Sequence, residues 1–303
     1  MRLVYYSLAN AHHAGREKQW TQSIRSLRRY NRAVPVRLFL FNGATAELLR
    51  EAERQHVDVH YLGDYGEFLR ETHGRGSVLA LYPTLHKFLV LSHAPLGDVN
   101  QLLYLDCDTF FFDNVDRLFD QYSAHAWYAR EEPSSRRSYF AYDPDHIDED
   151  LLEHIARAEG LRRVPPFNSG VCLLNHGIWH DFEHLRIPYL DLAWRLLCGR
   201  ELNGHNSALL HEPEIQQAVL ASVADVDRMY ALPYPSLNTW IIEQIALWLT
   251  LGHLPAFSLG TFARSVVPQG GEFHDVSRSG GRCILAHYYS GTENEFFEAV
   301  ARI

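Results

Sequence analysis

The sequence predicts an α/β fold in which a mostly parallel central sheet is flanked by helices. Short apolar runs alternate with segments of helical periodicity along the first hundred residues, which is typical of parallel strands joined by covering helices. A second observation is the stretch 102–112, in which an apolar run ends in two carboxylates one residue apart. A third is that no internal repeat, low-complexity segment or linker interrupts the 303 residues. We therefore expect one domain, residues 1–303.

The first half of the chain supplies most of the predicted sheet. Apolar runs of four to eight residues predict strands over 3–8, 36–41, 57–62 and 102–105. Amphipathic periodicity predicts helices over 16–30, 44–55 and 82–92. Ser7, Ala9 and Asn10 are interpreted as the loop after the first strand. Four arginines around the first helix are interpreted as a solvated face rather than as a phosphate site, namely Arg25, Arg28, Arg29 and Arg32.

The second half is predicted to be more helical. The strands expected there are 124–129, 167–175 and 283–289. The helices expected there are 114–121, 148–159, 176–198, 212–224, 239–250 and 293–303. Residues 130–147 are polar and contain two prolines, and we interpret them as a long loop at the mouth of a site.

Composition excludes several classes of partner. Lys and Arg number 28 and Asp and Glu 37, so the net charge of −9 argues against nucleic acid and anionic membranes. None of the four cysteines forms a Cys-x-x-Cys pair, which argues against a zinc ribbon and fits reduced cysteines in a cytoplasmic protein. The first residues do not resemble a signal peptide, and no apolar stretch reaches the roughly 20 residues of a transmembrane helix.

The most informative residues are Asp106 and Asp108, which follow the predicted central strand. Residues i and i+2 of a strand share a face, so we expect both carboxylates to point together. They repel each other unless a cation lies between them or one is protonated. Like His287, they lie at or just after strand ends, where ligands bind in open α/β sheets. Oxygen ligands with one imidazole suit Mn²⁺ or Mg²⁺.

Such a metal indicates the kind of ligand that it binds. A metal held by few protein groups usually has its shell completed by substrate phosphates, which indicates a nucleotide diphosphate. The metal and Lys87 would then stabilise the charge of a departing diphosphate.

Each of these residues also has a purely structural interpretation. The two aspartates can cap a strand by accepting hydrogen bonds from loop amides, and His287 can be a buried core residue. Lys87 can be a surface lysine, and Asn168 can close a turn on its own backbone. Gln244 can be a buried helix amide with no chemical role.

Several motifs together resemble one known family. Tyr104-Leu105-Asp106-Cys107-Asp108-Thr109 resembles the Asp-x-Asp motif of GT-A-fold glycosyltransferases, and Lys87 precedes it on a predicted helix. The motifs that follow, in the family's order, are Phe167-Asn168-Ser169-Gly170, Glu243-Gln244 and Ala286-His287-Tyr288-Tyr289-Ser290-Gly291. The chain is therefore similar to retaining glycosyltransferase family 8, which includes glycogenin and bacterial lipopolysaccharide galactosyltransferases.

The resemblance covers most of the chain and implies a GT-A fold. Residues 1–130 would be the Rossmann-like half that binds the nucleotide sugar. Residues 131–303 would be the acceptor-binding and C-terminal half of the same domain.

The resemblance also implies a role for each matched residue. The metal ligands would be Asp106, Asp108 and His287. The donor-binding residues would be Ser7, Ala9, Asn10, Lys87, Asp106, Cys107, Asp108, Asn168, Ser169, Gly170 and Gly291. The catalytic residues would be Gln244, Glu243, Lys87 and Asn168, with Gln244 facing the reacting carbon.

The sequence departs from the family at two points. The family usually continues after the terminal glycine with a Lys-Pro-Trp that contacts the diphosphate, whereas Gly291 is followed by Thr-Glu-Asn. We hypothesise that Arg278 or Arg282 supplies the missing charge. The acidic residue before Gln244 is Glu243 rather than Asp, so its carboxylate is one methylene longer.

These features predict a metal-dependent retaining glycosyltransferase. It would move a sugar from a UDP-linked or other nucleotide-diphosphate donor to a glycan, a lipid-linked saccharide or a peptide. One alternative, which the missing lysine favours, is a degenerate sugar-nucleotide-binding protein without catalysis. A less favoured one is an Asp-x-Asp phosphatase, because such enzymes usually carry the motif on their first strand.

Overall fold

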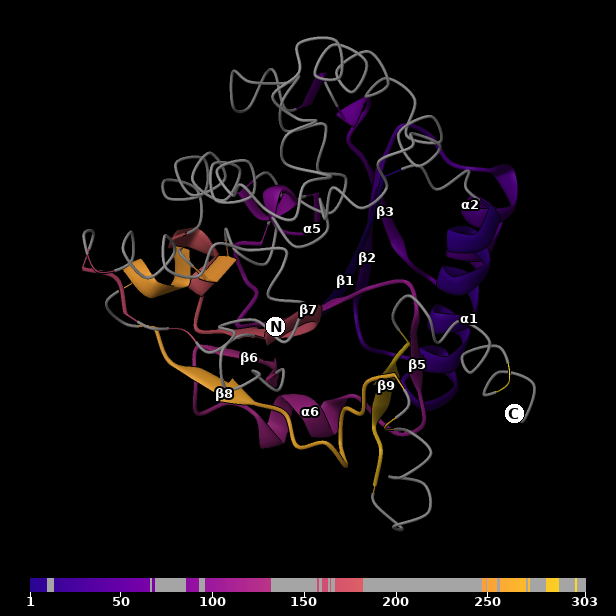
Figure 1. Ribbon diagram of the computed structural model, residues 1–303. Coiled ribbons are helices and arrows are strands. Elements are labelled where there is room, and N and C mark those ends of the chain that lie inside the picture. Colours follow the sequence, from indigo (N-terminus) through magenta and orange to yellow (C-terminus); the bar gives the residue numbers. More distant parts are fainter. Residues whose placement is uncertain are drawn as a thin grey trace, which may run out of the picture.

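The computed structural model describes residues 1–9, 14–65, 67–68, 86–92, 96–131, 157, 160–162, 164, 167–181, 247–248, 250–254, 257–270, 272, 282–288 and 298. Seven strands in this part of the chain form a central sheet (Figure 1). They are β1 (Arg2–Ala9), β2 (Val36–Phe41), β3 (Asp58–Tyr61), β4 (Gln101–Leu105), β6 (Trp127–Glu131), β7 (Phe167–Asn175) and β8 (Leu259–Thr261). A second, two-stranded sheet pairs β5 (Thr109–Phe111) with β9 (Leu285–His287).

The central sheet has the strand order β3-β2-β1-β4-β7-β6-β8. The first four strands in this order are parallel to one another, so their carboxyl ends meet at one edge. β7 is antiparallel to both β4 and β6, and β8 is parallel to β6. The predicted α/β class with a mostly parallel central sheet is therefore confirmed.

Helices cover both faces of the sheet (Figure 1). α1 (Ala14–Tyr30) and α2 (Ala46–Arg54) lie on one face, and α5 (His86–Leu89) lies on the other, where it continues into the short helix Val90–Ser92. Two further helices with bounds in the described part of the chain are α6 (Asp116–Gln121) and the short η4 (Ile178–Asp181). Among the described helices, none has the length and apolar character needed to cross a membrane.

Alternate strand residues fill two apolar layers. Val4, Tyr6 and Leu8 of β1 pack in the same buried cluster as Trp20 and Ile24 of α1. Burying each such large side chain stabilises the fold by roughly 1.5–3 kcal/mol.

The opposite face of the sheet is aromatic. The rings of Tyr5 and Tyr104 lie 5.0 Å apart, and Phe88 of α5 packs on Tyr104 at 5.4 Å. This face therefore fixes the position of α5, the helix that carries Lys87.

Three local predictions differ from the structure. β1 continues through Ala9, because Ser7, expected in a loop, is buried and hydrogen-bonded to His86. β6 begins at Trp127 and includes Arg130, which was expected in a loop. Arg130 is buried because Glu272, far along the chain, accepts two hydrogen bonds from its guanidinium. β5 and β8 were not predicted, since each has only three residues.

A further difference concerns the two aspartates themselves. β4 ends at Leu105, and Asp106 to Asp108 form a turn into β5. Their convergence therefore comes from a turn and not from strand alternation.

Several predictions fall on residues outside the described part of the chain. These are most of the helices expected over 148–159, 176–198, 212–224, 239–250 and 293–303, and the loop over 132–147. The site residues Asn10, Glu243, Gln244 and Gly291 and the hypothesised Arg278 also lie outside it.

Candidate functional site

The turn between β4 and β5 carries the central carboxylates. It lies where the chain leaves the seven-stranded sheet and enters the two-stranded one. The amide of Asp106 donates to the Gly170 carbonyl of β7 at 2.8 Å, and the Asp108 carbonyl accepts from the Tyr288 amide at 3.0 Å. The Thr109 hydroxyl closes the turn by donating to the Asp106 carbonyl at 2.9 Å. The backbone of the turn is thus held by both sheets.

The Asp106 carboxylate is oriented by two donors. Lys87 Nζ lies 3.1 Å from its Oδ2, and the Tyr104 hydroxyl donates a short hydrogen bond to its Oδ1. Burial alone would raise the pKa of Asp106, but the charges of Lys87 and His287 and these hydrogen bonds lower the pKa below its ordinary value. Asp106 is therefore a carboxylate in the folded protein.

His287 reaches the carboxylates because β9 pairs with β5. Its register partner is Thr109, the residue after Asp108. Its Nε2 lies 3.3 Å from Asp108 Oδ1 and 3.7 Å from Asp106 Oδ2. Burial would lower the pKa of His287, but the charges of Asp108 and Asp106 outweigh burial and raise it.

Gly170 leaves the space that the imidazole of His287 occupies. A Cβ on Gly170 would lie no farther than 2.8 Å from the ring atoms Cε1, Nε2 and Nδ1. No side chain fits there unless the ring moves. The structure thus explains on steric grounds why the Phe-Asn-Ser-Gly motif ends in glycine: the backbone of Gly170 packs directly against the His287 ring.

Asp106, Asp108 and His287 fit a divalent cation. One ligand atom from each lies within 4.8 Å of the others. Two cis ligands of an ion with bonds near 2.1 Å are separated by about 3 Å, and His287 Nε2 lies 3.3 Å from Asp108 Oδ1 and 3.7 Å from Asp106 Oδ2. Asp108 Oδ1 is buried, its ion-pair partner among the described residues is His287 Nε2 at 3.3 Å, and a cation would compensate its charge further. Two carboxylates and one imidazole are ligands that Mn²⁺ and Mg²⁺ accept.

Lys87 is a buried cation beside this group. Its side chain is only 10% exposed, and its Nζ also lies 3.4 Å from the Ser169 hydroxyl. The Tyr5 hydroxyl donates to the Lys87 carbonyl at 3.0 Å and so fixes the start of α5 on the sheet. The interpretation of Lys87 as a surface residue is therefore wrong.

The other residues singled out in the sequence lie around the same edge. Ser7 Oγ lies 2.7 Å from His86 Nδ1, and burial, with the charges of Arg16 and Lys87, lowers the pKa of His86 to about 3. His86 is therefore neutral. Asn168 Oδ1 accepts from the Gly170 amide at 2.8 Å, which is the local bond expected of its structural interpretation.

Cys107 turns away from the carboxylates. Its thiol contacts Gln19 Oε1 of α1 at 3.5 Å, and burial raises the pKa of the thiol well above its usual range. A protonated thiol directed at a helix is not a metal ligand.

Sequence reasoning missed Tyr104 and Thr109. The signal for Tyr104 was present, because Tyr104 and Asp106 are two residues apart and the i, i+2 rule applied to Asp106 and Asp108 places their side chains together. The role of Thr109 depends on the turn geometry, for which the sequence gives no comparable signal.

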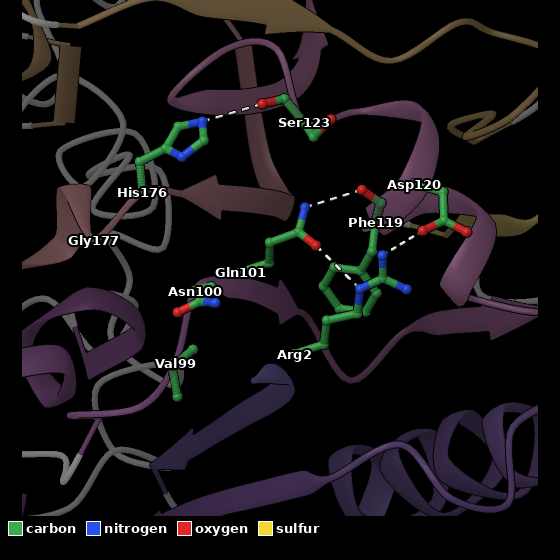
Figure 2. Close-up of a pocket in the computed structure, with 9 residues that line it drawn as sticks. All are labelled: Arg2, Val99, Asn100, Gln101, Phe119, Asp120, Ser123, His176 and Gly177. Carbon is green, nitrogen blue, oxygen red and sulfur yellow. Dashed lines mark hydrogen bonds and ion pairs between the residues drawn. The ribbon is translucent and has the colours of Figure 1, made fainter.

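A separate hollow of about 690 Å³ lies at the opposite edge of the sheet (Figure 2). It is lined by Arg2, Val99, Asn100, Gln101, Phe119, Asp120, Ser123, His176 and Gly177. Its polar side chains bond to one another and to backbone carbonyls, as Figure 2 shows for Arg2, Gln101 and His176. The hollow does not contain the residues that the sequence singled out.

Comparisons with known proteins give structural neighbours only. No protein-family model matches the sequence, and no curated protein is significantly similar to it. Mouse xyloside xylosyltransferase 1 is similar in structure, with 13% identity, a TM-score of 0.47 and coverage of 96% of this chain and 99% of that one. The galactosyltransferase LgtC, in complex with donor and acceptor sugar analogues, has 12% identity and a TM-score of 0.47, with coverage of 100% of this chain and 96% of that one. GlyE of Streptococcus pneumoniae has 12% identity and a TM-score of 0.49, with coverage of 99% of this chain and 60% of that one.

All three neighbours are glycosyltransferases, the class of enzyme that the sequence motifs resemble. Identities and TM-scores of this size do not carry an activity or a substrate to this chain. The chemistry therefore has to follow from the chain's own residues.

Proposed function

We propose that this protein is a metal-dependent glycosyltransferase that uses a nucleotide-diphosphate sugar, with UDP as the expected nucleotide. One observation carries the proposal. Asp106, Asp108 and His287 come from two distant parts of the sequence, yet their ligand atoms lie within 4.8 Å of one another at the carboxyl edge of the parallel strands. Lys87 lies beside them as a buried cation. This arrangement suits a diphosphate that shares a metal with the protein.

Each residue would have a distinct role in this reaction. A bound Mn²⁺ or Mg²⁺ would supply positive charge to the two phosphates of the leaving group. Lys87 would stabilise the charge that develops on the departing diphosphate, and Tyr104 would keep the Asp106 carboxylate in its ligating orientation. Because Lys87 is largely buried, its charge acts with less screening by water than a surface lysine's would.

The finer parts of the proposal rest on the family resemblance. These are retention at the anomeric carbon, with Gln244 beside that carbon and Glu243 near the sugar hydroxyls. Asn168, Ser169 and Gly170 would border the donor, and Ser7 to Asn10 would face the base. The anomeric configuration of the product, read by NMR, tests retention: an inverted product contradicts it.

The direct test of function is a screen of nucleotide sugars for hydrolysis with and without Mn²⁺. The proposal expects metal-dependent release of nucleoside diphosphate from at least one donor, lost in Asp108→Asn. Tight metal-dependent binding of a nucleoside diphosphate without turnover of any donor would instead support the non-catalytic alternative. Release of phosphate from phosphomonoesters, with no nucleotide binding, would support the phosphatase.

A further inference from the structure

The second cation expected at the diphosphate is missing after Gly291, and Arg282 does not replace it. The Ile284 carbonyl accepts from the Phe112 amide at 2.8 Å, which places the start of β9 at the far end of β5 from Asp108. Arg282 precedes this point and is exposed. An extended strand rises about 3.3 Å per residue, so the five residues to His287 separate Arg282 from the carboxylates.

One face of α1 runs along the turn and β5. Ser26 Oγ accepts from the Phe111 amide at 2.9 Å, and Ser23 Oγ lies 2.9 Å from Thr109 Oγ1. Gln19 contacts the thiol of Cys107 at 3.5 Å. These three helix positions are separated by three or four residues and therefore share one face. As α1 is followed towards its N-terminus, its contacts move from β5 to the turn that holds the aspartates.

Arg16 is the next residue on that face, one turn before Gln19. Its Nη1 donates to the Ala9 carbonyl at 3.3 Å, at the end of β1. β1 and β4 are parallel and end at Ala9 and Leu105, so Ala9 lies at the same edge of the sheet as the turn that follows β4. The half-buried Arg16 is thus held at the level of the turn.

Arg16 and Lys87 approach this edge from opposite faces of the sheet, one on α1 and the other on α5 (Figure 1). The charge of Arg16 reaches the start of α5, where it contributes to the lowered pKa of His86, the residue before Lys87.

We infer that Arg16 is a binding residue for the diphosphate of the donor and supplies the charge that the chain lacks after Gly291. The inference rests on the proposed function. The guanidinium has several donors in one plane and matches phosphate oxygens better than an ammonium does. Arg16 and Lys87 would then hold the diphosphate from two sides, with the metal site between them.

The test compares Arg16→Ala and Arg16→Lys with Arg29→Ala. Arg29 is an exposed arginine at the other end of the same helix, where it lies over the Tyr30 ring. Calorimetric titrations with Mn²⁺ present would measure the binding of UDP, GDP, ADP, uridine and inorganic pyrophosphate. Mn²⁺ alone would be titrated as well, and thermal melting would verify the fold.

We expect Arg16→Ala to weaken nucleoside-diphosphate and pyrophosphate binding about 10- to 100-fold, the size of a lost charged hydrogen bond. Arg16→Lys should lose less, and Arg29→Ala should bind like the wild type. Uridine and Mn²⁺ alone should bind Arg16→Ala as they bind the wild type, which a general structural defect would not allow.

The outcomes separate the two claims. Wild-type protein that binds none of the diphosphates with Mn²⁺ overturns the proposed function, and this inference with it. Diphosphate binding that is equal in the wild type and Arg16→Ala overturns the inference alone. An equal loss of uridine and UDP binding also overturns it, because Arg16 would then contact the nucleoside.

Discussion

The two edges of the central sheet are both polar, but their charges are balanced in different ways. At the amino edge, Arg2 donates to Gln101 at 3.1 Å and pairs with Asp120 (Figure 2). Arg2 also pairs with Asp116. Gln101 in turn donates to the Phe119 carbonyl at 2.9 Å. The cation and its carboxylates thus satisfy one another.

At the carboxyl edge, Asp106 and Asp108 face a single imidazole and a lysine. Asp108 Oδ1 is buried against the His287 imidazole at 3.3 Å, and burial opposes the charge of both Asp106 and His287. Such an arrangement costs free energy in the absence of a ligand. A polar cluster whose groups satisfy one another serves the fold, whereas one that needs an external cation indicates a binding site.

The largest effect that tests this contrast is expected for Asp108→Asn. The change removes one charge from the metal site but keeps the shape of the side chain. We expect metal-dependent turnover to fall by about 10³ or more, roughly 4 kcal/mol of barrier. The same substitution at the amino edge, Asp120→Asn, should leave turnover unchanged. Full activity of Asp108→Asn in the nucleotide-sugar assay would remove the metal assignment.

Gly170→Ala should have the next largest effect. The new Cβ would overlap the His287 ring, so we expect Mn²⁺ affinity to fall about 10- to 100-fold and the free energy of unfolding to fall by about 1–3 kcal/mol. Calorimetry and urea denaturation measure the two quantities.

The double variant Gly170→Ala/His287→Ala separates the clash from a general defect. Without the imidazole the added methyl has room, so stability should recover while metal binding stays weak. If the free energy of unfolding does not recover, the effect of Gly170→Ala does not come from a clash with the His287 ring.

Tyr104→Phe should have a smaller effect. It removes the hydroxyl that donates to Asp106, while Lys87 still holds the other oxygen. We expect about a tenfold loss of Mn²⁺ affinity, near the lower end for a hydrogen bond to a charged group. Tyr122→Phe is the matched control, because the Tyr122 hydroxyl contacts the Ala263 amide away from the site. Equal losses in the two variants would show that Tyr104 does not act on Asp106.

The smallest effect is expected for Arg2→Ala at the amino edge. Its ion pairs are partly exposed to solvent, so we expect a loss of about 0.5–1 kcal/mol in unfolding free energy. Metal affinity and turnover should not change. A loss of activity in a normally folded Arg2→Ala protein would contradict the assignment of a purely structural role to the amino edge.

Much of the fold could be predicted because the relevant signals are local. Trp20, Ile24 and Leu27 are fully buried, as their helical spacing predicts, and β2 and β7 have the bounds expected from their apolar runs. The charged Arg130 was misplaced because its partner, Glu272, lies 142 residues away. Periodicity over a short window cannot register such a pair.

The candidate site was predictable in its residues more than in its geometry. The motif order brought together Asp106, Asp108 and His287, which the structure does place within reach of one cation. The strand alternation used for the two aspartates was wrong, since they lie in a turn. Tyr104, which is still in β4, is the residue whose side chain meets Asp106. The role of the α1 face that carries Arg16 could not be predicted, because it depends on the turn and on β5, which pack against that face.

The central claim is that Asp106, Asp108 and His287 together hold one divalent cation. A titration of Mn²⁺ followed by electron paramagnetic resonance, on the wild type, His287→Ala and Asp120→Asn, tests it most directly. We expect one site in the wild type, unchanged affinity in Asp120→Asn and affinity reduced at least tenfold in His287→Ala. Wild-type affinity in His287→Ala, or no Mn²⁺ binding to the wild type with or without UDP, would contradict it.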